Sequence, residues 1–136
     1  MRRKIADAVG FTLAFVLILA AACAPSRKTG GDVTGTVEFA GKPVNYGAIT
    51  IVGEDRHAAI SEIKNGAYLL KQPPFGPCKI MILTAPPPPP DGVDFAKYKP
   101  PPDYIDVPMR YGRVETSGLT LAVTEQPQTH NIKLTK

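Results

Sequence analysis

A two-residue alternation of apolar and polar side chains runs through the first half of residues 32–52, and this period is typical of a half-buried β-strand. The apolar positions are Val33, Val37 and Phe39. Gly41 and Pro43 follow and predict a chain reversal, because glycine accepts a positive φ and proline fixes φ without offering an N–H. Residues 49–52 are rich in β-branched side chains, which favours a strand covered on both faces. The stretch therefore predicts a β-hairpin.

Two glycines in this region carry specific predictions. Gly35 falls on the apolar face of the first strand, and a glycine weakens a strand unless the strand bulges or another backbone approaches closely. We therefore expect a close-packed point at Gly35. Asn65 and Gly66 predict the tight turn of a second hairpin, because this pair accepts the positive φ values of a type I′ turn.

Short apolar runs separated by turn residues continue to the end of the chain. They predict strands at residues 57–63, 67–71, 79–84, 119–123 and 130–134, with a weak edge strand at 104–107. Residues 72–77 hold three prolines and a glycine, so we expect the chain to leave the sheet there and cross over. We expect no helix after residue 22. The pattern predicts one all-β domain, a single antiparallel sandwich of seven strands.

Several of these residues recur in the order and spacing of one known family. They are Gly35 and Val37, the turn Gly41-Lys42-Pro43-Val44, Gly47 and Ile49, then Asn65-Gly66 with Tyr68 and Leu70, Pro73-Pro74-Phe75-Gly76, and Tyr111 with Thr116-Ser117-Gly118-Leu119-Thr120. Together they resemble the carboxypeptidase-regulatory-like, transthyretin-like (prealbumin-like) domain of many small bacterial lipoproteins, especially of planctomycete type. Phe75 interrupts what is usually Pro-Pro-Gly in that family. The resemblance covers residues 32–134 and implies a Greek-key sandwich.

The transthyretin-like fold also has an enzymatic branch, the hydroxyisourate hydrolases. That branch resembles a tetramer whose tail carries Tyr-Arg-Gly-Ser, whereas residues 131–136 here read NIKLTK. In metallocarboxypeptidases the related domain brings no catalytic residues of its own. A hydrolase of the transthyretin-like type is therefore the less favoured interpretation, and a fold does not by itself supply a function.

The residue chemistry agrees with a non-catalytic chain. His57 and His130 have no second His, Cys or carboxylate at ligand spacing, so we predict no metal site and no cofactor. Glu54 and Asp55 are adjacent within a predicted turn, where acidic residues are common for local reasons. The serines after residue 22 are Ser26, Ser61 and Ser117, and none lies in a nucleophile elbow. We predict no catalytic residues.

The N-terminus has the pattern of an export signal. Three basic residues precede an uncharged apolar run, residues 8–22, that ends in small side chains. Residues 19–23 read LAAAC and resemble a lipobox, which implies cleavage before Cys23 and lipid on its thiol and amine. The predicted organisation is a helical lipoprotein signal peptide at 1–22, a tether at 23–31 and the sandwich at 32–136. Cleavage by the ordinary signal peptidase near Ala22 or Ala24 and a retained anchor remain alternatives.

Charge and cysteine content narrow the possible partners. Without residues 1–22 the chain keeps 13 Lys and Arg against 11 Asp and Glu, and these charges are scattered, so no electrostatic surface for nucleic acid is predicted. Acylation of Cys23 would leave Cys78 as a single cysteine on an apolar strand face, where we expect a buried, inert thiol. A disulfide between Cys23 and Cys78 is the alternative if Cys23 is not acylated.

Proline dominates the segment between residues 85 and 112. Nine prolines occur within residues 85–108, and no sheet interior tolerates this because each proline removes a backbone donor. The run of five predicts a polyproline II rod of about 15 Å. We expect a proline-rich excursion at 85–112 that either is a plain structural detour or contacts a partner. The candidate contact residues are Pro86, Pro87, Pro88, Pro89, Pro90, Tyr98 and Tyr104.

Together these features predict a non-catalytic cell-envelope lipoprotein that serves as a structural or interaction module. It would be held at a membrane by lipid on Cys23, would face the periplasm or the cell surface, and would contact an envelope protein or polysaccharide. A carbohydrate- or peptide-binding module is the alternative. Sugar sites lean on exposed aromatics, and the chain has no Trp, while four aromatics cluster between residues 95 and 111.

Overall fold

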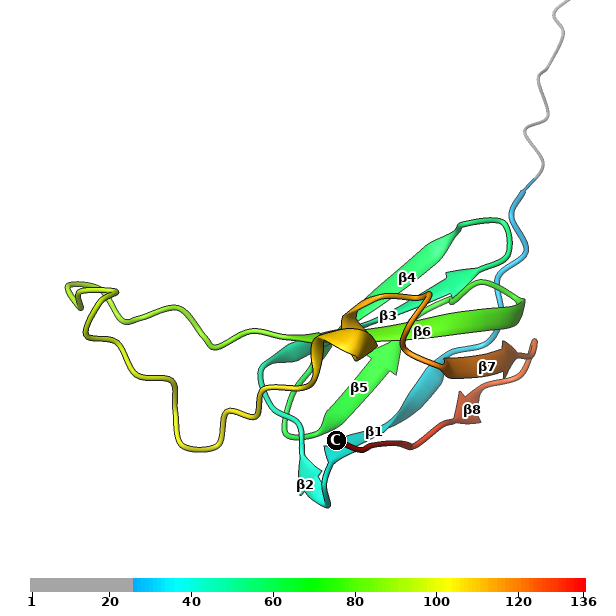
Figure 1. Cartoon of the computed structure of the whole chain (residues 1–136). Helices are drawn as coiled ribbons and strands as arrows, with labels where there is room; N and C mark the ends of the chain where they lie inside the picture. Colours follow the sequence, from blue (N-terminus) through cyan, green and yellow to red (C-terminus); the bar gives the residue numbers. More distant parts are fainter. Residues whose placement is uncertain (1–25) are drawn as a thin grey trace, which may run out of the picture.

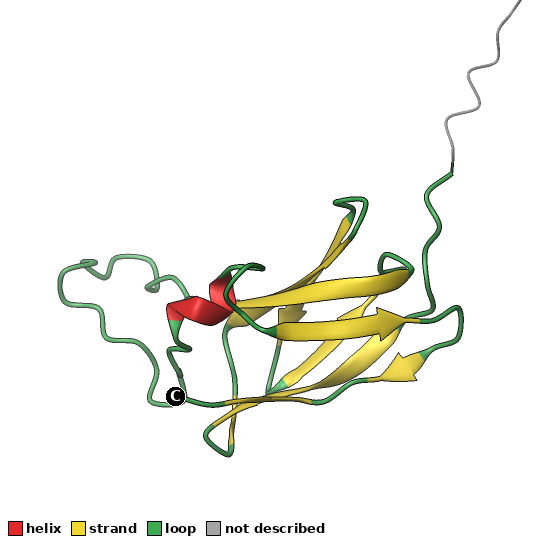
Figure 2. Ribbon diagram, turned by 45° about the vertical axis from the view of Figure 1, so that its right-hand side comes forward, coloured by secondary structure: helices red, strands yellow, loops and turns green. Residues whose placement is uncertain are grey.

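The computed structural model describes residues 26–136, so the signal peptide and lipidation site predicted at residues 1–22 and at Cys23 lie outside the described residues. The described chain is all-β, with two packed sheets and one short 3₁₀ helix (Figure 2). Its elements are β1 Val33–Phe39, β2 Lys42–Pro43, β3 Gly47–Gly53, β4 Ala58–Ile63, β5 Ala67–Leu70, β6 Gly76–Thr84, η1 Met109–Gly112, β7 Leu119–Val123, β8 Gln128–Thr129 and β9 Ile132–Leu134. Within residues 26–136, no helix is both long enough and apolar enough to cross a membrane.

The two sheets differ in how their strands pair. One sheet has the order β4-β3-β6-β7, and all of its pairs are antiparallel. The other is organised around β1, which pairs antiparallel with β2 and β5 and parallel with β8 and β9. The chain passes from one sheet to the other four times, at the β2–β3, β4–β5, β5–β6 and β7–β8 connections (Figure 1).

Alternate side chains of both sheets meet in one apolar core. Ile49 and Ile51 of β3 and Ile80 and Ile82 of β6 face the second sheet and are at most 1% exposed. The facing layer comes from β1, β5 and β9, through Val33, Val37, Leu70, Ile132 and Leu134. The opposite face of β3 is also largely covered, with Thr50 9% exposed, so the prediction for residues 49–52 is confirmed in large part. Cys78 lies in the core as predicted, 3% exposed.

Gly35 is a point of close backbone contact, as its position in the strand pattern predicted. A Cβ atom built there would lie 1.8 Å from the carbonyl oxygen of His130. The Tyr68 hydroxyl donates to the same carbonyl at 2.5 Å, and burial raises the pKa of Tyr68 to about 12. The missing side chain therefore lets the C-terminal segment run directly beside β1, where the His130 N–H donates to the Thr34 carbonyl at 2.8 Å.

The predicted hairpin at residues 32–52 is wrong, because β1 and β3 belong to different sheets. The turn at Gly41 does form a hairpin, but its return strand is β2, which is only two residues long. Val44 still donates its N–H to the Val37 carbonyl at 2.9 Å, and its side chain has no exposed surface. The pairing ends there because the turn at Gly66 takes the remaining bonds: the Val37 N–H donates to the Gly66 carbonyl at 2.7 Å, and the Gly66 N–H donates to the Val44 carbonyl at 3.0 Å. A two-residue alternation shows which face of a strand is buried but does not name the strand that pairs with it.

The last part of the chain also departs from prediction. Residues 104–107 form no strand, and η1 follows them although no helix was expected. The predicted strand at 130–134 is β9, which pairs parallel with β1, so a purely antiparallel sandwich is wrong. The chain leaves β7 in one sheet and crosses to the other before it reaches β8 and β9, and this crossing sets their parallel direction.

The tight turn predicted at Asn65 and Gly66 is present. Their φ angles are 52° and 76°, as a type I′ turn requires, and Lys64 and Ala67 exchange two backbone hydrogen bonds of 2.9 Å. The turn packs beneath Pro43, since a Cβ atom on Gly66 would lie 2.7 Å from the Pro43 Cβ.

We expect Gly66→Val to lower the free energy of unfolding by about 2 kcal/mol more than Gly41→Val does, because overpacking adds to backbone strain. Gly41 is the matched control, since its φ is 79° but nothing lies within 4 Å of its Cβ position. Urea denaturation of the three proteins measures the difference. Equal losses for the two variants would show that the contact with Pro43 is unimportant.

Candidate functional site

The proline-rich excursion projects from one end of the sandwich as a long loop (Figure 1). It leaves β6 at Thr84 and returns at Val107, which is buried at 6% exposure. The expected excursion extended to residue 112, but Tyr111 in η1 is buried against the core and only 6% exposed. We therefore call residues 85–106 the proline arm and treat η1 as part of the sandwich.

The base of the proline arm is held by hydrogen bonds on both of its limbs. The outgoing limb is fixed where the Ala85 N–H donates to the Tyr46 carbonyl at 3.0 Å. The returning limb is fixed by the Val107 N–H, which donates to Thr84 Oγ1 at 3.1 Å, and by Asn45 Nδ2, which donates to Asp103 Oδ2 at 3.1 Å. These contacts set the direction in which the arm leaves the body.

The two limbs are also joined to each other farther out. The Tyr98 hydroxyl donates to the Pro87 carbonyl at 2.7 Å and bridges the returning limb to the proline run. Tyr98 and Tyr104, the two tyrosines predicted as partner contacts, are both only half-exposed. Within the proline run, Pro86, Pro88 and Pro90 are exposed, and Pro87 and Pro89 are half-exposed. Tyr98 therefore has a role inside the arm, and the exposed prolines remain free for contact.

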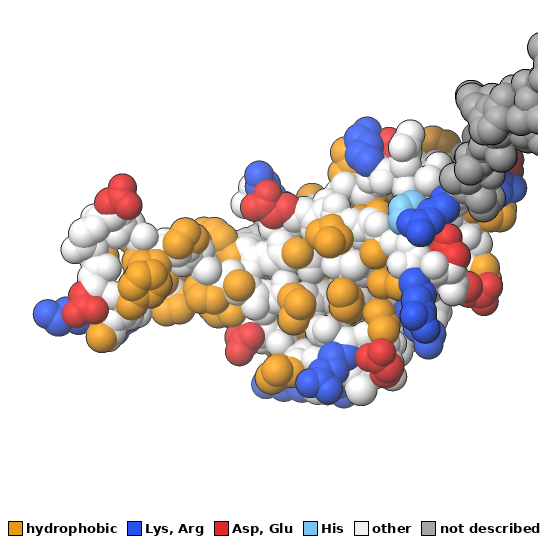
Figure 3. Space-filling model, turned by 90° about the horizontal axis from the view of Figure 1, so that it is seen from above, with side chains coloured by type: hydrophobic (Ala, Val, Ile, Leu, Met, Phe, Trp, Pro, Cys, Tyr) orange, Lys and Arg blue, Asp and Glu red, His pale blue; other side chains and the backbone are white. Residues whose placement is uncertain are grey.

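The most exposed aromatic side chain of the arm is Phe95, at 80%. It lies in a turn at the tip, where the Lys97 N–H donates to the Asp94 carbonyl at 2.9 Å and the Ala96 N–H donates to Asp94 Oδ1 at 3.0 Å. Val93 beside it is 41% exposed. Hydrophobic side chains gather along the projecting arm (Figure 3). Phe95 was not among the predicted contacts, although one large apolar residue in a polar turn, DGVDFAK, is a readable signal.

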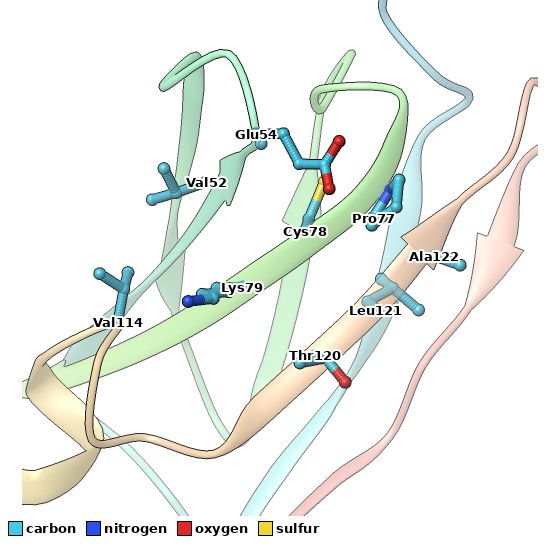
Figure 4. A pocket seen from close by; sticks show the side chains of 10 residues that line it. Val52, Glu54, Pro77, Cys78, Lys79, Val114, Thr120, Leu121 and Ala122 are labelled. Atoms are coloured by element: carbon cyan, nitrogen blue, oxygen red, sulfur yellow. The ribbon is translucent and has the colours of Figure 1, made fainter.

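A concavity of about 630 Å³ lies on the outer face of the β4-β3-β6-β7 sheet (Figure 4). Its lining residues are mostly apolar, with one cation, Lys79, and one anion, Glu54. The lining consists of Val52, Gly53, Glu54, Pro77, Cys78, Lys79, Val114, Thr120, Leu121 and Ala122. Neither charged side chain forms an ion pair with another residue of 26–136.

Cys78 borders this concavity but does not have the environment of a nucleophile. Burial raises the pKa of its thiol, and the nearby carboxylates of Asp55 and Glu54 raise it further. Its Sγ lies 3.3 Å from the carbonyl oxygens of Pro74 and Gly76. Because the thiolate is the reactive form, these surroundings favour an inert thiol.

The other polar residues considered for chemistry have local structural roles. Asp55 Oδ1 accepts the N–H of His57 at 2.9 Å inside the β3–β4 turn. The buried Ser117 hydroxyl donates to the Ile80 carbonyl at 2.6 Å and ties the loop before β7 to β6. Among residues 26–136, no group of three or more His, Cys, Asp or Glu side chains is arranged to hold a metal ion.

A scan against known protein families, a search of curated proteins and a search of solved structures each found no match for this chain. The concavity and the proline arm must therefore be interpreted from their own geometry.

We expect Tyr98→Phe to loosen the proline arm by about 1 kcal/mol while the melting temperature of the sandwich stays unchanged, because the lost hydrogen bond joins the two limbs only. Limited proteolysis within residues 91–97 and amide exchange at the tip should both become faster. Tyr104→Phe is the matched control, since its hydroxyl makes no hydrogen bond within the described residues. Equal proteolysis of the two variants would contradict a bracing role for Tyr98.

Proposed function

We propose that this chain is a non-catalytic cell-envelope lipoprotein whose β-sandwich presents the proline arm to a protein partner. Lipid on Cys23 attaches it to the membrane, and the domain faces the periplasm or the cell surface. The observation that carries the proposal is Phe95, which is 80% exposed at the tip of an arm held by hydrogen bonds at its base and between its limbs. An ordered loop that displays a large apolar side chain is typical of a binding segment.

The arm is suited to binding because little of its freedom remains to be lost. Prolines restrict the outgoing limb, and the Tyr98 hydroxyl joins it to the returning limb. A segment that is already ordered loses less entropy when it docks, so more of the contact energy appears as affinity. Apolar burial of Phe95 would then supply the anchor of the interface.

The positions of the two ends of β6 support the same proposal. The N-terminal segment lies at its Gly76 end, where the Gly30 N–H donates to the Pro73 carbonyl at 2.8 Å and the Phe75 N–H donates to the Lys28 carbonyl at 3.2 Å. The arm leaves from the Thr84 end (Figure 1). A strand of nine residues spans about 30 Å. If the lipid is attached before residue 26, the arm therefore starts from the end of the domain that is remote from the attachment point.

The charge of the arm favours a protein over a lipid surface or nucleic acid. Residues 85–106 carry four aspartates and two lysines, so the arm has no excess of positive charge to attract phosphate groups. The outer-face concavity offers a sugar no aromatic platform, because none of its lining residues is aromatic. A protein surface with an apolar socket fits the exposed Phe95 best.

For the fold we propose the carboxypeptidase-regulatory-like, transthyretin-like Greek-key sandwich that the sequence resembles. Seven strands remain when the two-residue strands β2 and β8 are set aside. The close contact at Gly35 and the tight turn at Asn65 and Gly66, both parts of the resemblance, are present. These features support the proposal from the geometry of the backbone.

Replacing residues 86–102 with a short Gly-Ser linker tests the proposed function. We expect the melting transition to survive, because these residues contribute nothing to the buried core. Partners that the wild-type chain retains from an envelope extract of its native host should be lost. Phe95→Ala, which leaves the arm in place, should lose the same partners. If both variants fold and keep every partner, the proline arm is a structural detour and the proposal is wrong.

A further inference from the structure

The chain carries both an exposed apolar knob and an unfilled apolar hollow. The knob is Phe95 at the tip of the proline arm, 80% exposed. The hollow is the outer-face concavity, whose lining includes Val52 of β3, Val114 of the η1–β7 loop and Lys79 of β6 (Figure 4). The volume of the concavity, about 630 Å³, falls within the range of small-molecule pockets, about 300–1,000 Å³, so it has room for one aromatic side chain.

The knob of one chain cannot fill the hollow of the same chain. The arm is clamped at the Thr84 end of β6, whereas the concavity lies toward the Gly76 end, where Gly53 pairs with Cys78 and Pro77 pairs with Ala122. The arm also points away from the body rather than back along it (Figure 1). Any such contact must therefore be made between two molecules.

The charges around the knob and the hollow are complementary. Asp94 and Lys97 flank Phe95, and the concavity presents Lys79 and Glu54. None of these four side chains forms an ion pair with another described residue. A Phe95 seated in the concavity can place Asp94 beside Lys79 and Lys97 beside Glu54, and such pairing fixes orientation and specificity.

We infer that the partner of the proline arm is a second copy of this chain, and that two copies pair reciprocally with the Phe95 of each in the concavity of the other. The inference rests on the proposed function, since it names the partner of the same arm. Reciprocity uses both sites in both molecules and closes the assembly at two, as a two-fold axis requires. Arm and concavity lie toward opposite ends of β6, so the copies are antiparallel. If both chains are anchored to one membrane, the β6 strands of the dimer would then run parallel to the membrane surface.

Sedimentation equilibrium of the full-length chain in detergent tests the inference. We expect a monomer–dimer equilibrium with a dissociation constant below about 1 mM. The interface is weak because it consists of two small apolar contacts. Phe95→Ala should weaken the dimer by at least about thirtyfold, because it removes the anchor on both sides. Leu69→Ala is the control, since Leu69 is 43% exposed on β5 of the other sheet and should leave the dimer unchanged. A monomer at every concentration would overturn the inference.

A charge reversal decides whether the concavity receives the tip. Lys97→Glu and Glu54→Lys each place like charges together, so each should weaken the dimer by about tenfold. The side chains of both residues make no hydrogen bond within residues 26–136, so their replacement changes charge without breaking local structure. The double variant should regain wild-type affinity, because opposite charges then face each other again at both contacts, with their signs exchanged. A double variant no better than the single ones would show that the tip docks elsewhere.

The outcomes also separate this inference from the proposed function. If the full-length chain stays monomeric while Phe95→Ala loses envelope partners, the arm binds a different protein and only the inference fails. If the wild type dimerises and the charge reversal restores pairing, the arm binds a second copy and both stand. If Phe95→Ala changes neither association nor capture, the proposed function fails as well.

Discussion

Replacement of Gly35 by alanine is expected to lower the free energy of unfolding by about 4 kcal/mol, which is most of the stability of a small domain. The added Cβ would lie 1.8 Å from the His130 carbonyl oxygen and 2.9 Å from the Tyr68 hydroxyl. Backbone hydrogen bonds hold β1 to β8 and β9, which lie on either side of His130 in the sequence. Neither β1 nor the His130 segment can therefore move away without breaking that pairing. Urea denaturation followed by circular dichroism measures the loss.

Gly112→Ala is the matched control for Gly35→Ala. Its added Cβ would lie 2.6 Å from Leu83 Cδ2, which is the end of a side chain that is 55% exposed and free to rotate. We therefore expect a loss below about 1 kcal/mol at Gly112. A small loss at both positions would mean that the C-terminal segment does not run as close to β1 as described.

Cys23→Ala is expected to abolish lipid attachment and release the protein from the membrane fraction. Labelled fatty acid should enter the wild type and not the variant, because the thiol proposed to carry the acyl group is gone. A single acyl chain gives only reversible binding, at about 0.8 kcal/mol per buried CH₂, so firm retention of the wild type implies more than one chain. Cys78→Ala is the control and should label normally. Equal labelling of wild type and Cys23→Ala would show that Cys23 is not the site of lipid attachment.

The features that could be predicted from the sequence are those that one residue type decides locally. Gly35 marked a close contact because no other residue lacks a Cβ atom, and Asn65 with Gly66 marked a turn because few residues accept positive φ. The pairing of β1 and β3 could not be predicted. The alternation in β1 and the β-branched run in β3 fit one hairpin and two separate sheets equally well, and the choice depends on how all the strands pack together.

The candidate site was predicted in outline and not in its residues. Proline composition located the arm, because nine prolines cannot lie in a sheet. Tyr98, one of the candidate contacts, donates its hydroxyl to the Pro87 carbonyl, and Phe95 is the most exposed aromatic side chain of the arm. Which aromatic faces outward depends on the path of the returning limb, and that path is set by hydrogen bonds to Thr84 and Asn45, which are distant in the sequence.

Photo-crosslinking from the tip of the proline arm tests the central claim most directly. A photoreactive phenylalanine analogue placed at position 95 of the full-length chain, expressed in its native host, should form a covalent adduct with a protein, either another envelope protein or a second copy of the chain. The same analogue at position 69, an exposed site on β5, should form none. Adducts from position 95 that are absent from position 69 are the predicted result. No adduct from position 95, or the same adducts from both positions, would contradict a role for the arm in binding.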